Sequence, residues 1–195
     1  KIKGYRNKES INGRIKSAVI RKDAGRYYVS VSVEEEIYKP MFTPQSIVGI
    51  DLGIKDLIVT SHNEKIKNII KDRSKRLKGL QKALARCKAG SKNRYKIKLK
   101  IQRLWQKIRN ARKYLIHDIT NKLIKENDII ACEDLDIKSM YKDHNIAKSL
   151  NSNPIGEIIR VLKYKADWNS KKLIQIDRYY PSSQECSVCG FQNKE

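Results

Sequence analysis

The sequence predicts an α/β fold built on a mixed sheet. Short apolar strands come first, a long helical segment interrupts them, and helices and strands alternate afterwards. A chain of 195 residues is long enough for one good-sized core, or for one domain with pieces of others. The formal net charge of +22 is far larger than solubility requires. It predicts a polyanionic partner, nucleic acid ahead of an anionic membrane.

The first predicted elements are two strands, residues 13–22 and 26–33. Both are rich in β-branched residues and tyrosine, and they flank the turn Asp23-Ala24-Gly25. This pattern is typical of a β-hairpin. The acidic run 34–36 and the stretch 40–44, which begins and ends with proline, then predict a linker.

A second β unit follows, with strands predicted at residues 47–51, 56–60 and 65–70. Two helices come next, over about 72–88 and 92–126. In the second helix, apolar residues recur at helical spacing: Ile97, Ile101, Leu104, Ile108, Leu115, Ile119 and Leu123, with Trp105 and Ile116 widening the stripe. We expect this helix to pack one face on a core and to turn its Lys and Arg residues outward.

The remaining elements alternate. A strand is predicted at 128–132, a helix from Pro154 to about residue 171, and a strand at 173–176. A cysteine-bearing tail opens at Pro181. Three hairpin-linked strands followed by alternating helices and strands favour an RNase H-like mixed sheet with flanking helices.

The positive charge is concentrated in one segment. Residues 65–125 hold 22 Lys/Arg against only Asp72 and Asp118, which is +20 of the total. A solvated helix surface usually mixes both signs, so this one-sided pattern favours contact with nucleic acid. The predicted nucleic-acid-binding residues are Arg94, Lys98, Arg103 and Lys107.

Two carboxylates end apolar strands. Asp51 closes the strand 47–51, and Glu133 directly follows the apolar run 129–132. Neighbouring strand ends in an α/β sheet can bring such groups together, and hard oxygen ligands suit Mg²⁺ or Mn²⁺. Two such ions could activate water and stabilise the leaving oxygen in phosphodiester hydrolysis. Spacing alone leaves the plainer interpretation open, in which Asp51 is a turn residue before Gly53 and Glu133 a surface acid.

Three motifs add a family resemblance. Residues 48–56, Val-Gly-Ile-Asp-Leu-Gly-Ile-Lys-Asp, resemble the first RuvC motif of the TnpB (OrfB) family of transposon-associated nucleases. Residues 130–135, Ile-Ala-Cys-Glu-Asp-Leu, resemble its second RuvC motif. Residues 180–190, which include Cys186 and Cys189, resemble the opening of its zinc ribbon. The motifs occur in the family's order and cover about residues 45–190.

The resemblance implies a metal-dependent, RNA-guided DNA endonuclease related to type V CRISPR effectors. Asp51 and Glu133 would be catalytic residues and ligands of Mg²⁺ or Mn²⁺, and the partners would be a guide RNA and target DNA. Cys186 and Cys189 would supply half of a Zn²⁺ site, although the spacing alone also fits a redox pair. In such systems basic surfaces hold the heteroduplex backbone. We expect a cytoplasmic location, with no membrane partner and no small-molecule substrate.

The resemblance also implies a division of the chain. Residues 1–44 would be the last strands of a small, wedge-like β-barrel domain with its linker. Residues 45–180 would form the RuvC, RNase H-like domain, including the basic helices 72–126, and 181–195 would begin the zinc ribbon. The family's third catalytic Asp follows that ribbon, whereas this sequence stops at Glu195 with one Cys pair. We therefore expect a fragment with weak or no cleavage by itself.

Two other functions stay open. The chain could be a nucleic-acid-binding protein without cleavage, such as a transposase relic or a guided repressor. It could also be a transposase proper, which joins strands, because RNase H-like folds support both chemistries.

Overall fold

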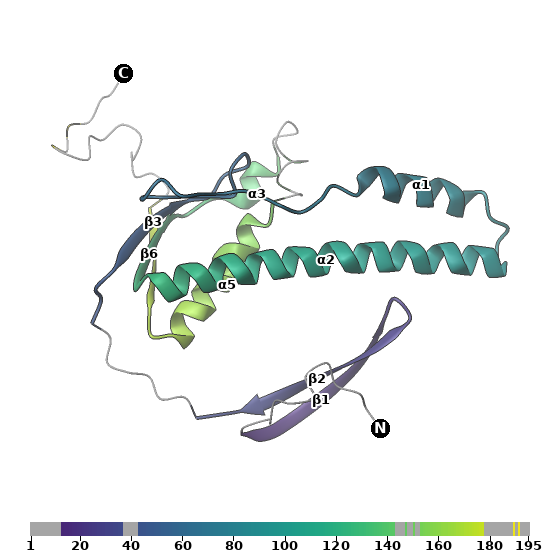
Figure 1. Ribbon diagram of the computed structural model, residues 1–195, viewed down its shortest axis with the longest axis horizontal. Helices are drawn as coiled ribbons and strands as arrows, with labels where there is room; N and C mark the ends of the chain where they lie inside the picture. Colours follow the sequence, from purple (N-terminus) through teal and green to yellow (C-terminus); the bar gives the residue numbers. More distant parts are fainter. Residues whose placement is uncertain are drawn as a thin grey trace. The chain divides into compact units, whose positions relative to one another are not determined.

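The computed structural model describes residues 13–36, 43–142, 147, 150, 153–177, 189 and 191. The chain forms two compact units. The first unit combines Lys1–Lys39 with Lys71–Ala111, and the second combines Pro40–Ile70 with Arg112–Glu195. The interpretation from sequence keeps residues 72–126 with 45–180, and the domain boundaries stay a prediction. Figure 1 shows the elements of both units.

The first unit contains the predicted hairpin. Strands β1 (Arg14–Asp23) and β2 (Arg26–Glu34) pair antiparallel, with a register shift between Ile15 and Ser17. Ala24 and Gly25 form the tip with φ angles of 49° and 79°. Positive φ at both central residues is the geometry of a two-residue turn that matches the twist of the strands.

The hairpin tip is tied to a long helix of the same unit. Helix α2 (Lys92–Glu126) runs through both units, and its residues up to 111 belong to the first. The Asp23 carboxylate accepts a hydrogen bond from Arg109 at 2.7 Å, and Gln106 donates to the Tyr28 hydroxyl at 2.8 Å. The carboxylate of Asp23 therefore neutralises Arg109, one of the cations in the basic segment.

Helix α1 (Ser74–Ala85) precedes α2 and has no buried residue. The Arg94 guanidinium of α2 donates to the Leu84 carbonyl in the last turn of α1 at 3.0 Å, and to the carbonyl of Cys87, just beyond the helix, at 3.4 Å. A cation at a helix C-terminus also interacts favourably with the helix dipole. Arg94 therefore joins the two helices.

The second unit holds a five-stranded mixed sheet in the order β5-β4-β3-β6-β7. Strands β3 and β4, and β4 and β5, pair antiparallel, whereas β3 and β6, and β6 and β7, pair parallel. The bounds are β3 (Ile47–Asp51), β4 (Ile58–Thr60), β5 (Lys65–Ile66), β6 (Ile129–Glu133) and β7 (Lys172–Ile176). This unit also includes helices α3 (Ile137–Met140) and α5 (Ile155–Trp168).

One face of this sheet carries the core. Alternate strand residues point to the same face, and those of β3 and β6 on this face are buried. They pack against apolar residues of α2 and α5 in one cluster, which includes Val48, Ile50, Ile130, Cys132, Leu115, Ile116, Ile119, Ile158, Val161 and Leu162. The sequence prediction that α2 packs an apolar stripe on a core is confirmed for its second half.

A buried cation links the two covering helices. Lys165 of α5 donates to the Thr120 hydroxyl at 2.7 Å, to the Asn121 side-chain oxygen at 2.6 Å and to the His117 carbonyl at 3.1 Å. Burial lowers the pKa of Lys165. Oxygens of α2 thus satisfy a charge that would otherwise be costly to bury.

Asp128 ties together the starts of the central strands. Its carboxylate accepts hydrogen bonds from the backbone N–H groups of Gln45 at 2.9 Å and Ser46 at 3.1 Å, and lies 3.2 Å from the Lys171 ammonium. The hydrogen bond from the Gln45 N–H is the largest cause, and the bond from Lys171 the second, that lowers the pKa of Asp128 from 3.8 to about 2. The residues before β3 and β7 are thereby anchored at the start of β6.

Asp128→Asn is expected to lower the urea midpoint of unfolding at neutral pH, because the charged acceptor is lost. Since the folded-state pKa is depressed, the ionised carboxylate contributes stability above about pH 4, and this is lost as the pH falls towards about 2. The difference between wild type and variant should therefore narrow from pH 4 downwards. Asp118→Asn, at an exposed aspartate of α2, is the control and should change little. Equal midpoints for Asp128→Asn and wild type at pH 7 would contradict this role.

Several sequence predictions need correction. The strands predicted at 56–60 and 65–70 are shorter: Leu57 is fully buried and its N–H bonds to the Ile66 carbonyl, but it lies ahead of β4. Trp105 is 44% exposed rather than part of the core stripe, because the α2 residues of the first unit are largely exposed. The linker prediction falls partly on residues 37–42, which lie outside the described part of the chain. Within the described residues, no helix has the length and apolar character of a membrane span.

Candidate active site and nucleic-acid interface

Asp51 and Glu133 are the last residues of two neighbouring parallel strands. In the β3–β6 ladder Gly49 pairs with Ala131, and Ile50 pairs with Cys132. The next residues on the two strands are Asp51 and Glu133, and neighbouring strands lie about 4.8 Å apart. Residues 82 positions apart in sequence thus meet at one edge of the sheet, as expected from their positions at strand ends.

Both carboxylates lie on the face of the sheet opposite the core. Ile50 and Cys132 are buried, whereas the next residues, Asp51 and Glu133, are exposed. Ile47, two pleats before Asp51 on the same face, is 64% exposed. The two carboxylates are therefore open to solvent and to a substrate, and the exposure of Glu133 is equally compatible with the plainer interpretation of a surface acid.

The turn after Asp51 depends on a glycine. A Cβ atom at Gly53 would lie 2.8 Å from the Asp56 carbonyl oxygen, closer than real side chains approach. The Gly53 N–H faces the Leu57 carbonyl at 3.4 Å, so the chain reverses tightly into β4. Glycine at this position therefore allows the return strand that holds Asp51 against Val59.

The sequence analysis missed a third strand-ending carboxylate, Asp177. It directly follows β7, whose last residue, Ile176, pairs with Glu133. The Asp134 N–H donates to the Ile176 carbonyl at 3.1 Å and closes this end of the ladder. The signal was the same as for Asp51, namely an acid after an apolar strand. Among the residues that the structure describes, however, no group of three or more His, Cys, Asp or Glu side chains could hold a metal ion.

The predicted nucleic-acid residues differ in their surroundings. Lys98, Arg103 and Lys107 are exposed along α2 in the first unit. Arg94 is half-buried and donates to the carbonyls that end α1. Three of the four are thus accessible to a phosphate backbone, whereas the guanidinium of Arg94 already has a structural role.

The predicted zinc ligands can be placed only in part. Cys189 is an exposed, free thiol, and Cys186 lies outside the described residues. The zinc site therefore stays a prediction.

The fold and this edge define a mixed-sheet α/β protein with paired strand-end carboxylates and a basic helical segment. Residues 28–144 match the OrfB_IS605 family, described as "Probable transposase", and residues 156–195 match the Cas12f1-like TNB domain. The first match covers more than half of the chain. The protein therefore belongs to the OrfB_IS605 family, which confirms the family expected from the motifs.

Curated relatives agree with this assignment. The chain is 34% identical over 174 residues to a "Putative RNA-guided DNA endonuclease" of Streptomyces pristinaespiralis, covering 88% of this chain and 43% of the relative. It is 32% identical over 208 residues to "Putative RNA-guided DNA endonuclease InsQ" of Escherichia coli (strain K12), covering 98% and 52%. The chain thus spans about half the length of these relatives.

Two solved structures share the fold. One is titled "Cryo-EM structure of the Cas12f1-sgRNA-target DNA complex", with a TM-score of 0.53 and 20% identity over 86% of this chain and 36% of that one. The other, a "CRISPR-Cas12f Ternary Complex", has a TM-score of 0.53 and 22% identity over 86% and 35%. At these identities the likeness concerns the fold alone.

Proposed function

We propose that the whole protein is an RNA-guided DNA endonuclease whose RuvC-type, RNase H-like site includes Asp51 and Glu133. The observation that carries the proposal is their register: two solvent-facing carboxylates end adjacent parallel strands of the sheet β5-β4-β3-β6-β7. That strand order, with β4 antiparallel to β3, supports the RNase H-like assignment. The names of the curated relatives support the same reaction.

The donor set fits a hard divalent cation. Asp51 and Glu133 would hold Mg²⁺ or Mn²⁺, which accept a few carboxylates and complete their shells with water and phosphate oxygens. When bound, such ions supply a nucleophilic water and stabilise the leaving oxygen. The two carboxylates face solvent, so a phosphodiester can approach them, and their negative charge would keep a strand away unless a cation is present.

The exposed cations of α2 would hold the nucleic-acid backbone. Lys98, Arg103 and Lys107 can contact phosphates without reading sequence, which suits a protein whose specificity comes from a guide. Cys186 and Cys189 are proposed as two thiolate ligands of Zn²⁺, since thiolates at this spacing suit that metal.

The test is cleavage by the whole protein purified together with the RNA that it retains. The retained RNA is sequenced, and labelled duplex DNA complementary to it is incubated with the complex in Mg²⁺ or in EDTA. Cleavage of the matched DNA in Mg²⁺ alone is expected. Cleavage that persists in EDTA, or that ignores the RNA sequence, would refute the proposal.

One observation favours a second candidate, a guided nucleic-acid-binding protein that does not cut. The described residues contain no group of three or more potential metal ligands. Tight binding of the matched DNA without cleavage in Mg²⁺ or Mn²⁺ would support this candidate over the first.

A further inference from the structure

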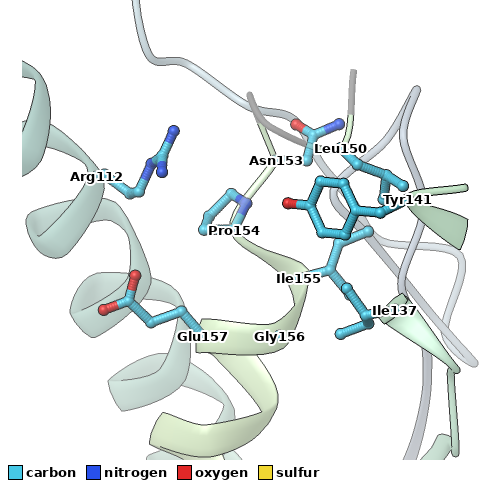
Figure 2. A pocket seen from close by; sticks show the side chains of 9 residues that line it. All are labelled: Arg112, Ile137, Tyr141, Leu150, Asn153, Pro154, Ile155, Gly156 and Glu157. Atoms are coloured by element: carbon cyan, nitrogen blue, oxygen red, sulfur yellow. The ribbon is translucent and has the colours of Figure 1, made fainter. Parts of the chain in front are cut away.

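The second unit contains a pocket whose lining residues do not include Asp51 or Glu133. It lies between α2, the end of α3 and the start of α5, and has a volume of about 230 Å³ (Figure 2). Pockets for drug-sized ligands span roughly 300–1,000 Å³, so this one suits a smaller group. A planar heterocycle such as a nucleobase is a group of this smaller class.

The lining combines an aromatic residue with a cation and an anion. Tyr141 is 43% exposed, and in Figure 2 its hydroxyl points towards Pro154. Arg112 and Glu157 lie on the other side of Pro154, one from α2 and the other from α5. A pocket lined by an aromatic ring, one hydrogen-bond donor and one acceptor offers the groups that a nucleobase uses, because bases stack on a ring and are read along a polar edge.

The charges distinguish a base from a free anion. Arg112 would favour a phosphate, whereas the carboxylate of Glu157, which lies 3.6 Å from the Arg160 guanidinium, lines the same pocket and disfavours an anion next to it. A carboxylate accepts hydrogen bonds from an exocyclic amine, as it does from cytosine. Guanidinium donors pair with the ring nitrogens and carbonyl oxygens of bases. The pair therefore suits a base that presents donor and acceptor groups side by side.

The pocket is joined to the loop that follows Asp51. Asn153, another lining residue, donates to the Ile54 carbonyl at 2.9 Å and accepts from the Asn68 amide at 2.8 Å. Asn153 is buried, and both ends of its side-chain amide are used in these bonds. A nucleotide held in the pocket would thus lie against the structure that positions the candidate active-site turn.

We propose that this pocket receives the base of one unpaired nucleotide, stacked on Tyr141 and hydrogen-bonded through Glu157 and Arg112. The preferred bases are those with an exocyclic amine. The proposal rests on the proposed function, since that function supplies nucleic acid as the partner. It goes beyond that function by assigning a base-specific contact outside the carboxylate edge and outside the basic surface of α2.

The test uses the 195-residue chain and a single-stranded oligouridylate of about 12 nucleotides with one central 2-aminopurine, a fluorescent base that carries an exocyclic amine. Binding is followed by quenching at about 0.5 M salt, where backbone contacts are weakened. Tyr141→Ala should weaken binding about 5- to 100-fold, as expected for loss of a stacking aromatic, and Tyr141→Phe should retain most of it. Tyr114→Ala, at an exposed tyrosine of α2 in the same unit, is the matched control.

A second variant tests the polar contact without removing the ring. With wild type, an unlabelled competitor with one central cytosine should displace the probe better than the same competitor with uracil, and Glu157→Ala should remove this preference. Circular-dichroism melting verifies that each variant folds. Unchanged quenching in Tyr141→Ala, or equal competition by cytosine and uracil with wild type, would overturn the pocket proposal. If the chain still binds oligonucleotides in a salt-dependent way, such a result refutes the pocket proposal alone. If the chain binds no oligonucleotide even at low salt, the result also refutes the proposed function.

Discussion

Replacing Asp51 by alanine in the whole protein is expected to abolish guided DNA cleavage while leaving DNA binding intact. The same result is expected for Glu133→Ala, because the two carboxylates end adjacent strands and would act on the same ions. Loss of a metal ligand removes several kcal/mol of transition-state stabilisation, which corresponds to at least a roughly hundredfold loss of rate. The measurement is the initial rate of cleavage of labelled duplex DNA in Mg²⁺, with binding followed separately by filter retention.

The matched control is Asp167→Ala, at an exposed aspartate on α5 of the same unit. This substitution also removes one negative charge, but at a position away from the strand ends. It should change the cleavage rate by no more than about twofold. Binding is expected to be unchanged or slightly stronger in the Asp51 and Glu133 variants, since a negative charge is removed near the strand. A rate near that of wild type in Asp51→Ala would show that the site lies elsewhere.

The double substitution Lys98→Gln and Lys107→Gln is expected to weaken nucleic-acid binding about equally for all sequences. If each lysine neutralises one phosphate, the slope of log K against log salt should fall by about two, and affinity at about 0.1 M salt should fall on the order of 50-fold. Adding Arg103→Gln should lower the slope by about one more. The measurement is a salt titration of binding to two unrelated oligonucleotides by fluorescence anisotropy.

The control is a second double variant that has the same net charge as the Lys98/Lys107 variant but loses its two lysines elsewhere in the chain. Lys163→Gln and Lys172→Gln remove two exposed lysines outside the basic segment 65–125. An equal loss of affinity in both double variants would show that overall charge, rather than the surface of α2, attracts the strand. Arg94 is kept unchanged because its guanidinium caps α1, so its replacement would alter folding as well as charge.

Much of the site could be predicted from local sequence. Each apolar run that precedes an acid forms a strand: β3 has the predicted bounds 47–51, and β6 spans 129–133 where residues 128–132 were predicted. Parallel strands that are neighbours bring their carboxyl ends to one edge, so a pairing of Asp51 with Glu133 followed once β3 and β6 were taken as neighbours. The same rule, applied to Asp177, would have added the third strand-ending acid.

The sequence by itself determined the order of strands and helices, the concentration of charge in residues 65–125 and the family to which the motifs belong. These depend on periodicity, composition and short motifs, which are local properties. Only the tertiary structure decided that Arg94 caps α1, that Trp105 is exposed, and that Tyr141 and Glu157 line one pocket with Arg112. The physical reason is that each of these depends on which side chains of other elements lie nearby, and that choice is made by packing across the chain rather than by the residue's own neighbours.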